Sequence, residues 1–446
     1  MIKKPVLWNE KIPFIKEAKE FYSKINYQGI NLWPIMAGEV YMFQSFPIKN
    51  KSEKFFFILK FLFTIDKFNI HGRKGNIFVS YPDSREDHHT LLIKSIEKFP
   101  KKEITLLDNY NWKKNKSIFK YKFRFPNPIL LFKIWKKFKK ENIKKVFGKN
   151  YLYFLMRTYF RYKQIKILEK IYNKFNPKAH IAFCSQAFAE DTILTLLAKK
   201  NKKPTFTLEH GFIPNFSYFL PVSVILENMI SDFFLVWGKR NYDIEKKFID
   251  QKKLLLAGNP KYILNEKVLK KFNPKIATFF FSVIGSEKSN INIIKILNNF
   301  SKKHPNIQFN MKLHPFDSIE NYKQYINSKN IKFVDTGLSV KELLEKSDFV
   351  ILHNTSVAQE TLLYNLPIFR FKDNFTQKIW GNFDTFKNEK EFENLFNNLK
   401  DKKFLLKHMR KYKMLLRNNF HFEKNKSPSQ IYYEKISKII KRGENK

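Results

Sequence analysis

From residue 276 to residue 371 the chain alternates short apolar runs with helical patterns, and this alternation restricts the possible folds more than any other feature. We expect helices at 290–301, 318–327 and 340–346, between strands at 276–282, 308–313, 332–334, 348–352 and 367–371. Crossover connections of this length join parallel strands, and they are right-handed. The pattern therefore predicts a parallel α/β sheet.

The first half of the chain contains a long helical segment at 151–175 and strand-like runs at 76–81, 104–107, 179–184, 205–208, 233–237 and 254–257. At 446 residues the chain is too long for one ordinary core. We expect an N-terminal Rossmann-like domain with a helical insertion (1–245) and a C-terminal one with terminal helices (246–446). The predicted fold class is α/β, with two Rossmann-like domains facing a central cleft and a helical C-terminal end.

Charge and composition restrict the partners and the compartment. The net charge of +44 predicts attraction to an anionic surface, although Lys, Asn, Ile and Phe are abundant together, as A/T-rich coding would give. The single cysteine, Cys184, excludes an intramolecular disulfide. We see neither a secretory h-region nor about 18 consecutive apolar residues. We therefore expect a cytoplasmic protein, peripheral at the inner face of the plasma membrane.

Residues 128–149 read as a lysine-rich helix with Leu131, Trp135 and Phe138 near one stripe. A basic helix with Trp and Phe can lie on an acidic membrane surface. The alternative is a solvated helix whose apolar stripe packs on the domain. The sequence leaves both interpretations open.

The turn that follows the strand at 348–352 predicts a phosphate site. It contains Asn354, Thr355 and Ser356, and backbone N–H groups and hydroxyls at such a turn favour an anion. Glu360 lies one helical turn beyond Ser356, where a carboxylate can accept from ribose hydroxyls. An ordinary capped βα unit would show the same pattern.

Two other turns fall at the same predicted sheet edge. In the first, Gly285 would allow a phosphate to approach the backbone while Ser282 or Ser286 donates to it. In the second, Lys312-Leu313-His314-Pro315, the proline stops a strand and leaves His314 at the edge, where it can hydrogen-bond a leaving phosphate. The alternative for His314 is a capping or surface role.

Two segments of the first half offer acceptor-binding residues. Glu209-His210-Gly211 closes a strand, and either acidic or imidazole side chain could deprotonate a hydroxyl while Gly211 lets an acceptor come close. Arg85 and His88 lie in a loop between a strand and a helix, the usual place for ligand contacts. Adjacent histidines on a helix point in different directions, so we expect no metal site at His88 and His89.

The sequence KLHP at 312–315, followed by VKELLEKSDFVILHNTSVAQETLLYNLPI at 340–368, resembles bacterial surface-polysaccharide transferases of the two-domain GT-B type. The resembling families are the CDP-glycerol glycerophosphotransferases, the bacterial polysialyltransferases and the Kdo transferases of capsule lipid anchors. The resemblance implies that His314 and Pro315 contact the donor phosphate and that Thr355 and Ser356 hold it. The acidic-acidic-Gly motif of the sialyl and Kdo enzymes falls on residues 209–211, where His210 replaces the second acid and resembles the HG motif of the glycerophosphotransferases.

These features together predict a metal-independent, inverting glycosyltransferase that needs no cofactor. Its expected substrates are a nucleotide-activated sugar, cytidine-linked in preference to uridine-linked, and a hydroxyl of a glycan or lipid-linked glycan. Glu209, His210 and His314 are the expected catalytic residues. The alternatives are a polyol-phosphate transferase of the same fold, a basic nucleic-acid-binding protein, and an inactive scaffold that docks on membranes.

Overall fold

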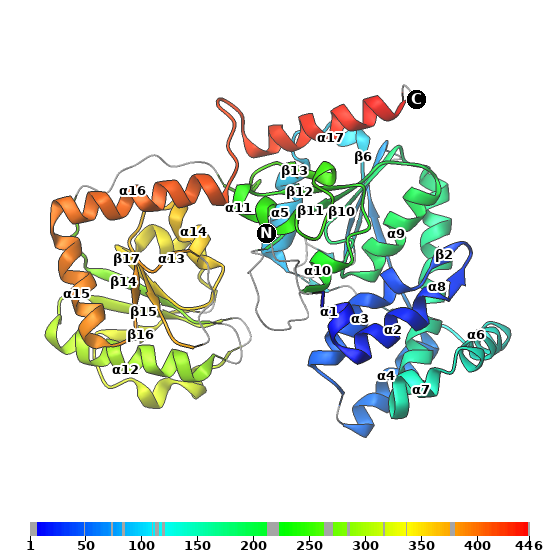
Figure 1. Ribbon diagram of the computed structural model, residues 1–446, viewed down its shortest axis with the longest axis horizontal. Coiled ribbons are helices and arrows are strands. Elements are labelled where there is room, and N and C mark those ends of the chain that lie inside the picture. Colours follow the sequence, from blue (N-terminus) through cyan, green and yellow to red (C-terminus); the bar gives the residue numbers. More distant parts are fainter. Residues whose placement is uncertain are drawn as a thin grey trace. The chain divides into compact units, whose positions relative to one another are not determined.

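The computed structural model describes residues 7–48, 50–72, 75–82, 85–108, 110–111, 116–117, 121–211, 223–262, 271–282, 286–314, 317–335, 337–374 and 380–444. The chain divides into two compact units. Unit 1 spans 1–210, 216–261 and 423–446, and unit 2 spans 211–215 and 262–422. Figure 1 labels the elements of both units.

Unit 1 is built on a sheet whose described strands follow the order β13-β12-β11-β10-β5-β6-β4. They pair in parallel, except that β4 is antiparallel to β6. The three central strands β11, β10 and β5 are buried along their whole length, as in a parallel sheet covered on both faces. The strands are β4 (Asn69–His71), β5 (Ile77–Tyr81), β6 (Ile104–Asp108), β10 (Ala179–Ala182), β11 (Thr205–Leu208), β12 (Phe233–Val236) and β13 (Leu254–Leu256).

A 25-residue helix, α8 (Tyr151–Phe175), organises the helical part of unit 1. It ends at Asn176, which adopts a left-handed conformation (φ 43°) and precedes Pro177, so the helix cannot continue. The described helices that pack against α8 include α4 (Lys51–Phe63), α6 (Pro128–Lys140), α7 (Ile143–Phe147) and α9 (Ala189–Lys200). The core around these helices combines aliphatic and aromatic side chains; for example, the rings of Phe147 and Phe154 stack with centroids 4.2 Å apart.

Further helices and three short strand pairs belong to the described part of unit 1. Its other helices are α1 (Trp8–Lys11), α2 (Pro13–Ser23), α3 (Trp33–Ser45), α5 (Glu86–Ile96), α10 (Val224–Glu227), α11 (Lys239–Glu245) and α17 (Pro428–Glu444). Its short antiparallel pairs are β1 (Asn26–Tyr27) with β2 (Ile30–Asn31), β3 (Thr64–Asp66) with β9 (Tyr121–Phe123), and β7 (Tyr110–Asn111) with β8 (Lys116–Ser117).

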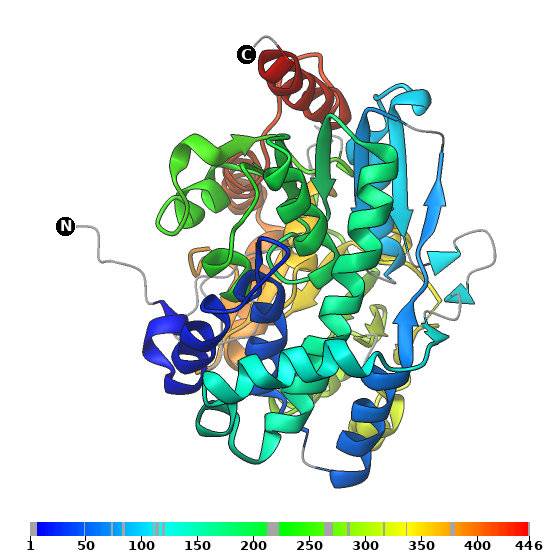
Figure 2. The same ribbon diagram turned by 90° about the vertical axis from the view of Figure 1, so that its right-hand side faces the viewer.

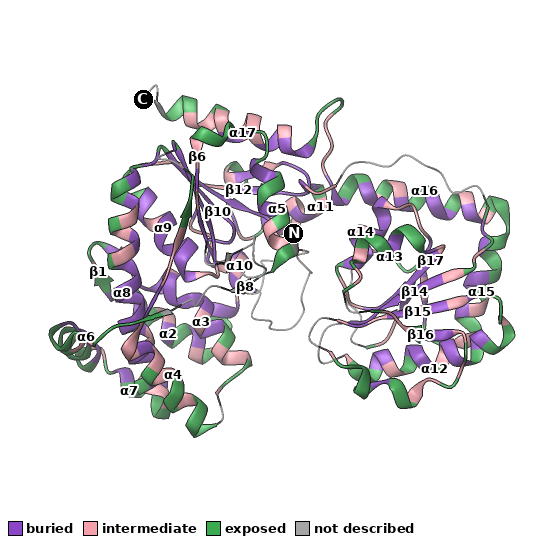
Figure 3. Cartoon of the chain, turned by 180° about the vertical axis from the view of Figure 1, so that it is seen from behind, coloured by how far each residue is buried: buried purple, intermediate pink, exposed green. Residues whose placement is uncertain are grey.

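Unit 2 has a sheet in the order β16-β15-β14-β17-β18-β19, and all of its described pairings are parallel. The strands are β14 (Ile276–Phe280), β15 (Gln308–Lys312), β16 (Ile331–Phe333), β17 (Phe349–Leu352), β18 (Ile368–Phe371) and β19 (Thr385–Phe386). The helices are α12 (Glu287–Lys303), α13 (Val340–Lys346), α14 (Val357–Leu363), α15 (Glu389–Lys400) and α16 (Lys402–Asn419). The inner strands β14, β17 and β18 are buried along most or all of their length, while the outer sides of α12 and α15 are exposed (Figure 3).

The division of the chain differs from the expected boundary at residue 245 in two places. β13, at residues 254–256, is still hydrogen-bonded to β12 as the edge strand of the first sheet. The C-terminal helix α17 packs on α5 of unit 1, and the hydroxyl of Tyr432 donates to the Gly258 carbonyl oxygen at 3.0 Å. The chain therefore returns to the unit in which it began, because the apolar face of α17 is buried there.

Two helical expectations were wrong in detail. Residues 318–327 form two short 3-10 turns, at Ile319–Asn321 and Lys323–Tyr325, in place of one helix. In α6 the buried stripe consists of Leu130, Ile134 and Phe138, whereas Trp135 is 44% exposed. Among the described helices, none combines the length and the apolar character needed to cross a membrane.

Candidate functional site

The carboxyl ends of three neighbouring strands bring the predicted donor residues of unit 2 together. Phe280 of β14 lies in register with Lys312 of β15 on one side and with Leu352 of β17 on the other. The segments that carry Ser282, His314 and Asn354 therefore leave the sheet at the same edge. Ligands of open α/β sheets bind at this edge.

Ser282 connects two of these turns. It is fully buried, its Oγ accepts a hydrogen bond from the Asn354 amide at 3.1 Å, and its own amide donates to Asn290 Oδ1 at 3.2 Å. This geometry gives Ser282 a role in holding the β14 and β17 turns together. Gly285, from the same predicted motif, lies outside the described residues.

A buried chain of hydrogen bonds continues from Asn290 toward His314. Asn290 Nδ2 donates to the Tyr322 hydroxyl at 3.2 Å, and that hydroxyl donates to Asp317 Oδ2 at 2.6 Å. The Asp317 amide then donates to the carbonyl oxygen of His314 at 2.9 Å. Burial raises the pKa of Tyr322, so the hydroxyl stays protonated as a donor. The backbone at His314 is thus fixed from within the unit, while its side chain is half-buried at the edge.

His353 anchors the start of the predicted phosphate turn. Its Nε2 lies 3.0 Å from Asp373 Oδ1, and Ser289 Oγ donates to the other oxygen of Asp373 at 2.5 Å. Burial lowers the pKa of His353, and the Asp373 carboxylate opposes that shift. The end of β17 is therefore tied to the end of β18 and to the first turn of α12.

The hydroxyls of Ser286 and Ser356 remain at the edge. Both residues immediately precede helices, α12 and α14, yet neither side chain caps its helix. Thr355 Oγ1 instead accepts from the amide of Val357 at 3.3 Å. Ser356 is exposed and Glu360 is half-buried one turn below it, which is the arrangement expected from their spacing.

Lys312 is directed toward a neighbouring loop. Its Nζ donates to the carbonyl oxygen of Asp335 at 3.3 Å, and burial lowers the pKa of its ammonium group. Pro315, the other flanking residue of the predicted histidine motif, lies outside the described part of the chain.

In unit 1, two predicted residues from distant segments meet at the carboxyl edge of the sheet. His210 follows β11 and His88 lies in the first turn of α5, after β5, with β10 between the two strands. The ring centroids of His88 and His210 are 5.6 Å apart. Phe183, which follows β10, packs against both rings, at 5.1 Å and 4.8 Å. The sequence did not predict that His88 and His210 pack against each other and against Phe183.

Glu209 is directed into the protein. Only 1% of the residue is exposed, and its carboxylate accepts from the Trp237 amide at 2.5 Å and from the Asn241 side chain. Burial raises the pKa of Glu209, and burial together with the nearby Glu209 charge raises the pKa of Glu245. The carboxylate therefore joins the end of β11 to the turn between β12 and α11.

The surroundings of the other predicted acceptor residues differ. A Cβ built on Gly211 would meet no atom within 4 Å, so space is open beside its backbone. Arg85 is exposed, and its carbonyl oxygen accepts from the Tyr81 hydroxyl at 2.5 Å. His89 is packed against Tyr81, and burial lowers its pKa to about 4.

Across the described residues, no group of three or more His, Cys, Asp or Glu could hold a metal ion.

Several residues of this network were missed by sequence reasoning. Asp373 follows β18 by two residues, so the strand-end rule that selected His314 would also have selected it. Asn290 and Tyr322 lie within α12 and next to a 3-10 turn, where polar residues are usually solvated. Only the tertiary structure shows that they are buried and bonded to each other.

No protein-family model matches the sequence, and no curated protein matches it. Solved structures do resemble it. A putative UDP-N-acetylglucosamine 2-epimerase from Listeria monocytogenes aligns with 83% of this chain and 97% of its own, at 10% identity and a TM-score of 0.50. Another UDP-N-acetylglucosamine 2-epimerase aligns over 82% and 97%, at 12% identity and the same TM-score. This likeness confirms the fold class, with two Rossmann-like units of the GT-B type.

Proposed function

We propose that the protein is an inverting glycosyltransferase that moves a sugar from a nucleotide-activated donor to a glycan hydroxyl. The observation that carries this proposal is the edge of unit 2, where hydrogen bonds connect the β14, β15 and β17 turns. Ser286, His314 and Ser356 all lie in segments that leave the sheet at this edge. Neutral donors on a rigid sheet edge suit a phosphate group.

On the donor side, Asn354, Thr355 and Ser356 would hold the phosphate, and Glu360 would accept from the ribose. His314 would hydrogen-bond the departing phosphate and, when protonated, offset its charge. The fixed backbone at His314 supports this role because a preorganised donor loses little by reorganisation during the reaction.

On the acceptor side, we assign the general base to His210. An imidazole at the sheet edge can take the proton of an acceptor hydroxyl as its oxygen attacks the anomeric carbon and the carbon–oxygen bond to the phosphate breaks. The nucleotide leaves with the bonding electron pair. His88, 5.6 Å away, and the open space at Gly211 would then help to place the acceptor.

The finer part of the proposal concerns the substrates and the place of action. The resemblance at 312–315 and 340–368 supports surface polysaccharide, such as capsule or lipooligosaccharide, as the product and a cytidine-linked sugar as the donor. The net charge of +44 supports action at the acidic inner face of the plasma membrane. A polyol-phosphate transferase would attack phosphorus instead of carbon, and the mass of the product separates the two reactions.

A second candidate function is 2-epimerisation of a nucleotide sugar. It is favoured by the two solved structures named above, which are UDP-N-acetylglucosamine 2-epimerases. Such a reaction needs no acceptor and exchanges the proton at C2 of the sugar. Incorporation of deuterium into UDP-N-acetylglucosamine in heavy water, with no acceptor present, would support epimerisation against transfer.

A thermal-shift screen with CMP, CDP, UDP, GDP and their sugars tests the donor class. We expect the largest increase in Tm with a cytidine nucleotide, because bound ligand stabilises the folded state by mass action. A larger increase with UDP than with any cytidine nucleotide would contradict the cytidine assignment and favour the epimerase.

For Ser356→Ala we expect about tenfold weaker donor binding with an unchanged Tm, since one hydrogen bond to a charged phosphate is lost from an exposed side chain.

For His314→Ala we expect donor hydrolysis to fall about 100-fold. The exposed Ser52→Ala, on α4 of unit 1, serves as the control for both measurements. An unchanged Kd in Ser356→Ala would remove that residue from the donor site.

A further inference from the structure

The segment 109–140 has an extreme charge composition. It contains eleven Lys and Arg residues and no Asp or Glu. Its last thirteen residues form α6, which packs on α8 and buries Leu130, Ile134 and Phe138. The Phe138 ring meets the ring of Phe21, on α2, edge to face at 5.0 Å. The five lysines of α6 are therefore carried by a helix that is attached to unit 1 through a buried apolar stripe.

The outer side of α6 is apolar as well as basic. Ile129 is 67% exposed, Phe132 61% and Trp135 44%, while the inward stripe is already buried. A helix that only needs solubility would carry polar residues at these positions. In Figure 2 α6 crosses the face turned toward the viewer, and Figure 3 shows it exposed along most of its length.

Lysines alternate with these apolar side chains. Lys133, Lys136, Lys139 and Lys140 are all exposed, and none of the four has a carboxylate within ion-pair distance among the described residues. The ammonium group of Lys139 lies 5.4 Å from the Trp135 ring centroid. The positive charge of this side of α6 is therefore not neutralised by the fold.

The segment that enters α6 extends the same character. Phe123 is 67% exposed and Phe125 is 78% exposed, and their ring centroids lie 5.2 Å apart. We define the α6 surface as Phe123, Phe125, Ile129, Phe132 and Trp135 together with Lys133, Lys136, Lys139 and Lys140.

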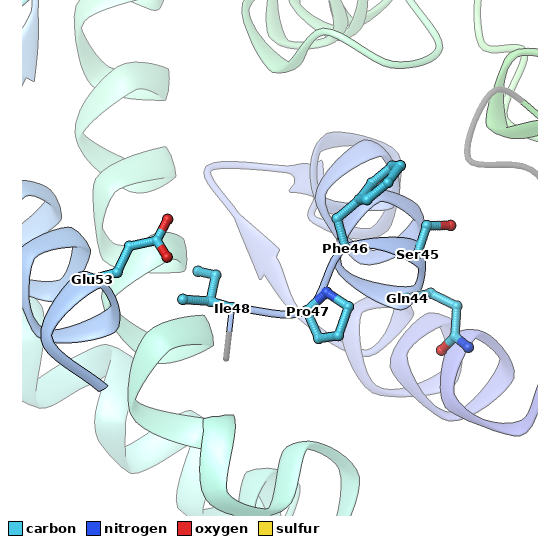
Figure 4. Close-up of a pocket in the computed structure, with 6 residues that line it drawn as sticks. All are labelled: Gln44, Ser45, Phe46, Pro47, Ile48 and Glu53. Carbon is cyan, nitrogen blue, oxygen red and sulfur yellow. The ribbon is translucent and has the colours of Figure 1, made fainter. Parts of the chain in front are cut away.

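Another part of unit 1 also has exposed aromatic residues, but a carboxylate, Glu53, lies close to them in the chain. Phe46 (68% exposed), Phe55 (62%) and Phe56 (64%) lie at the connection of α3 and α4 and on α4. A cavity of about 600 Å³ at this connection is lined by Gln44, Ser45, Phe46, Pro47, Ile48 and Glu53 (Figure 4). The Glu53 carboxylate in its wall would repel an anion, so the cavity itself is not part of the α6 surface.

We propose that the α6 surface binds the face of an anionic lipid bilayer, with the helix parallel to the membrane plane. The aromatic side chains and Ile129 would enter the boundary between headgroups and acyl chains, and the lysines would contact acidic headgroups. One exposed helix can lie flat on a bilayer. Its apolar side chains and its lysines would then both contribute to binding.

Only the biological role of membrane binding rests on the proposed function: it would bring the enzyme to a lipid-linked or membrane-associated glycan. Vesicle binding requires neither donor nor acceptor. A protein that binds vesicles but transfers no sugar would contradict the proposed function alone, and an active transferase that does not bind vesicles would contradict this inference alone.

The test is sedimentation of the full-length protein with vesicles of phosphatidylcholine alone or of phosphatidylcholine mixed with phosphatidylglycerol. We expect binding to the mixed vesicles only, and weaker binding at higher ionic strength. Lys136→Glu with Lys140→Glu should weaken binding at least about 25-fold, since each lysine near an anionic surface contributes a factor of about five. Phe132→Ser with Trp135→Ser should also release the protein.

Two matched variants serve as controls. Lys403→Glu with Lys407→Glu makes the same charge change at the same spacing on α16 of unit 2, and Met414→Ser changes a side chain that is 73% exposed there. Both should bind like the original protein. The assignment would be overturned if the charge control lost as much vesicle binding as the α6 lysine variant, or if both α6 variants bound vesicles normally. It would also be overturned if the α6 variants lost binding to single-stranded RNA but kept binding to vesicles.

Discussion

Glu209 and His210 are neighbours in the chain with opposite surroundings. The Glu209 carboxylate is buried and accepts from the Trp237 amide and the Asn241 side chain, whereas the His210 ring lies against His88 and Phe183. Successive side chains at a strand end point to opposite sides. Glu209 therefore suits a role in stability, and His210 suits the proposed role as general base.

Separate alanine variants should divide these roles. Glu209→Ala leaves a buried amide and a buried side-chain donor without their acceptor, so we expect a loss of about 2–4 kcal/mol in the free energy of unfolding. His210→Ala should keep its stability and lose turnover. Urea unfolding and initial-rate kinetics on both variants measure this, and the reverse pattern would identify Glu209 as the base.

Asp191 is a buried acid whose effect on stability depends on pH. It accepts from the Cys184 amide and the Ser80 hydroxyl, yet burial raises its pKa to about 8. Because the folded state favours the protonated acid, this contribution to stability is full below the ordinary pKa near 3.8 and is lost as the pH rises toward 8. Buried Glu209 and Glu245, whose pKa values are also raised, act in the same direction.

We therefore expect the free energy of unfolding to fall between pH 6.5 and 8, by up to about 1.4 kcal/mol per pH unit for each such acid. The pKa of buried His180 is lowered to about 3, so it changes little in this window. Asp191→Asn should reduce the slope in a urea-unfolding series over these pH values. A slope identical to that of the original protein would mean that Asp191 is ionised in the folded state.

At the scale of elements, the end of α4 depends on a residue a hundred positions away. Lys163 of α8 is buried, and its ammonium group donates to the carbonyl oxygens of Phe61 at 2.8 Å, Leu62 at 3.1 Å and Thr64 at 2.6 Å. These carbonyls have no partner within a helix that ends at Phe63. Burial lowers the pKa of Lys163 to about 8.

Lys163→Met should lower the free energy of unfolding by about 2–3 kcal/mol, because it removes charged hydrogen bonds and leaves buried carbonyls unsatisfied. Lys166→Met, three residues further along α8 and exposed, is the matched control. Chemical unfolding of the two variants measures the difference. Equal stability would show that water satisfies the end of α4 without Lys163.

At the scale of the molecule, the chain closes unit 1 with its last helix. α17 packs on α5, and Ile431, Tyr432 and Ile436 are buried, with no more than 1% of any of them exposed. The rings of Phe99 and Tyr433 meet edge to face at 5.0 Å. The C-terminal segment therefore belongs to the core of the first unit, although it follows the second in sequence.

Deletion of residues 428–446 should raise amide hydrogen exchange in α5 and β13 and leave the strands of unit 2 unchanged. The physical reason is that the apolar area covered by α17 becomes exposed in unit 1 alone. Exchange monitored by mass spectrometry on peptic peptides gives this comparison. Increased exchange in β14 or β17 would contradict the assignment of α17 to unit 1.

The sequence by itself determined most strands of the two sheets and most of the helices between them. It also determined the two Rossmann-like units and the polar turns at Ser282, His314 and Ser356. These depend on residues close together in the chain. Tertiary structure decided that Glu209 is buried, that His88 meets His210, and that α17 returns to unit 1. It also decided that Asn290, Tyr322 and Asp373 connect the turns at the carboxyl edge of the unit 2 sheet. Those outcomes depend on which distant residues share a buried space, which local periodicity does not specify.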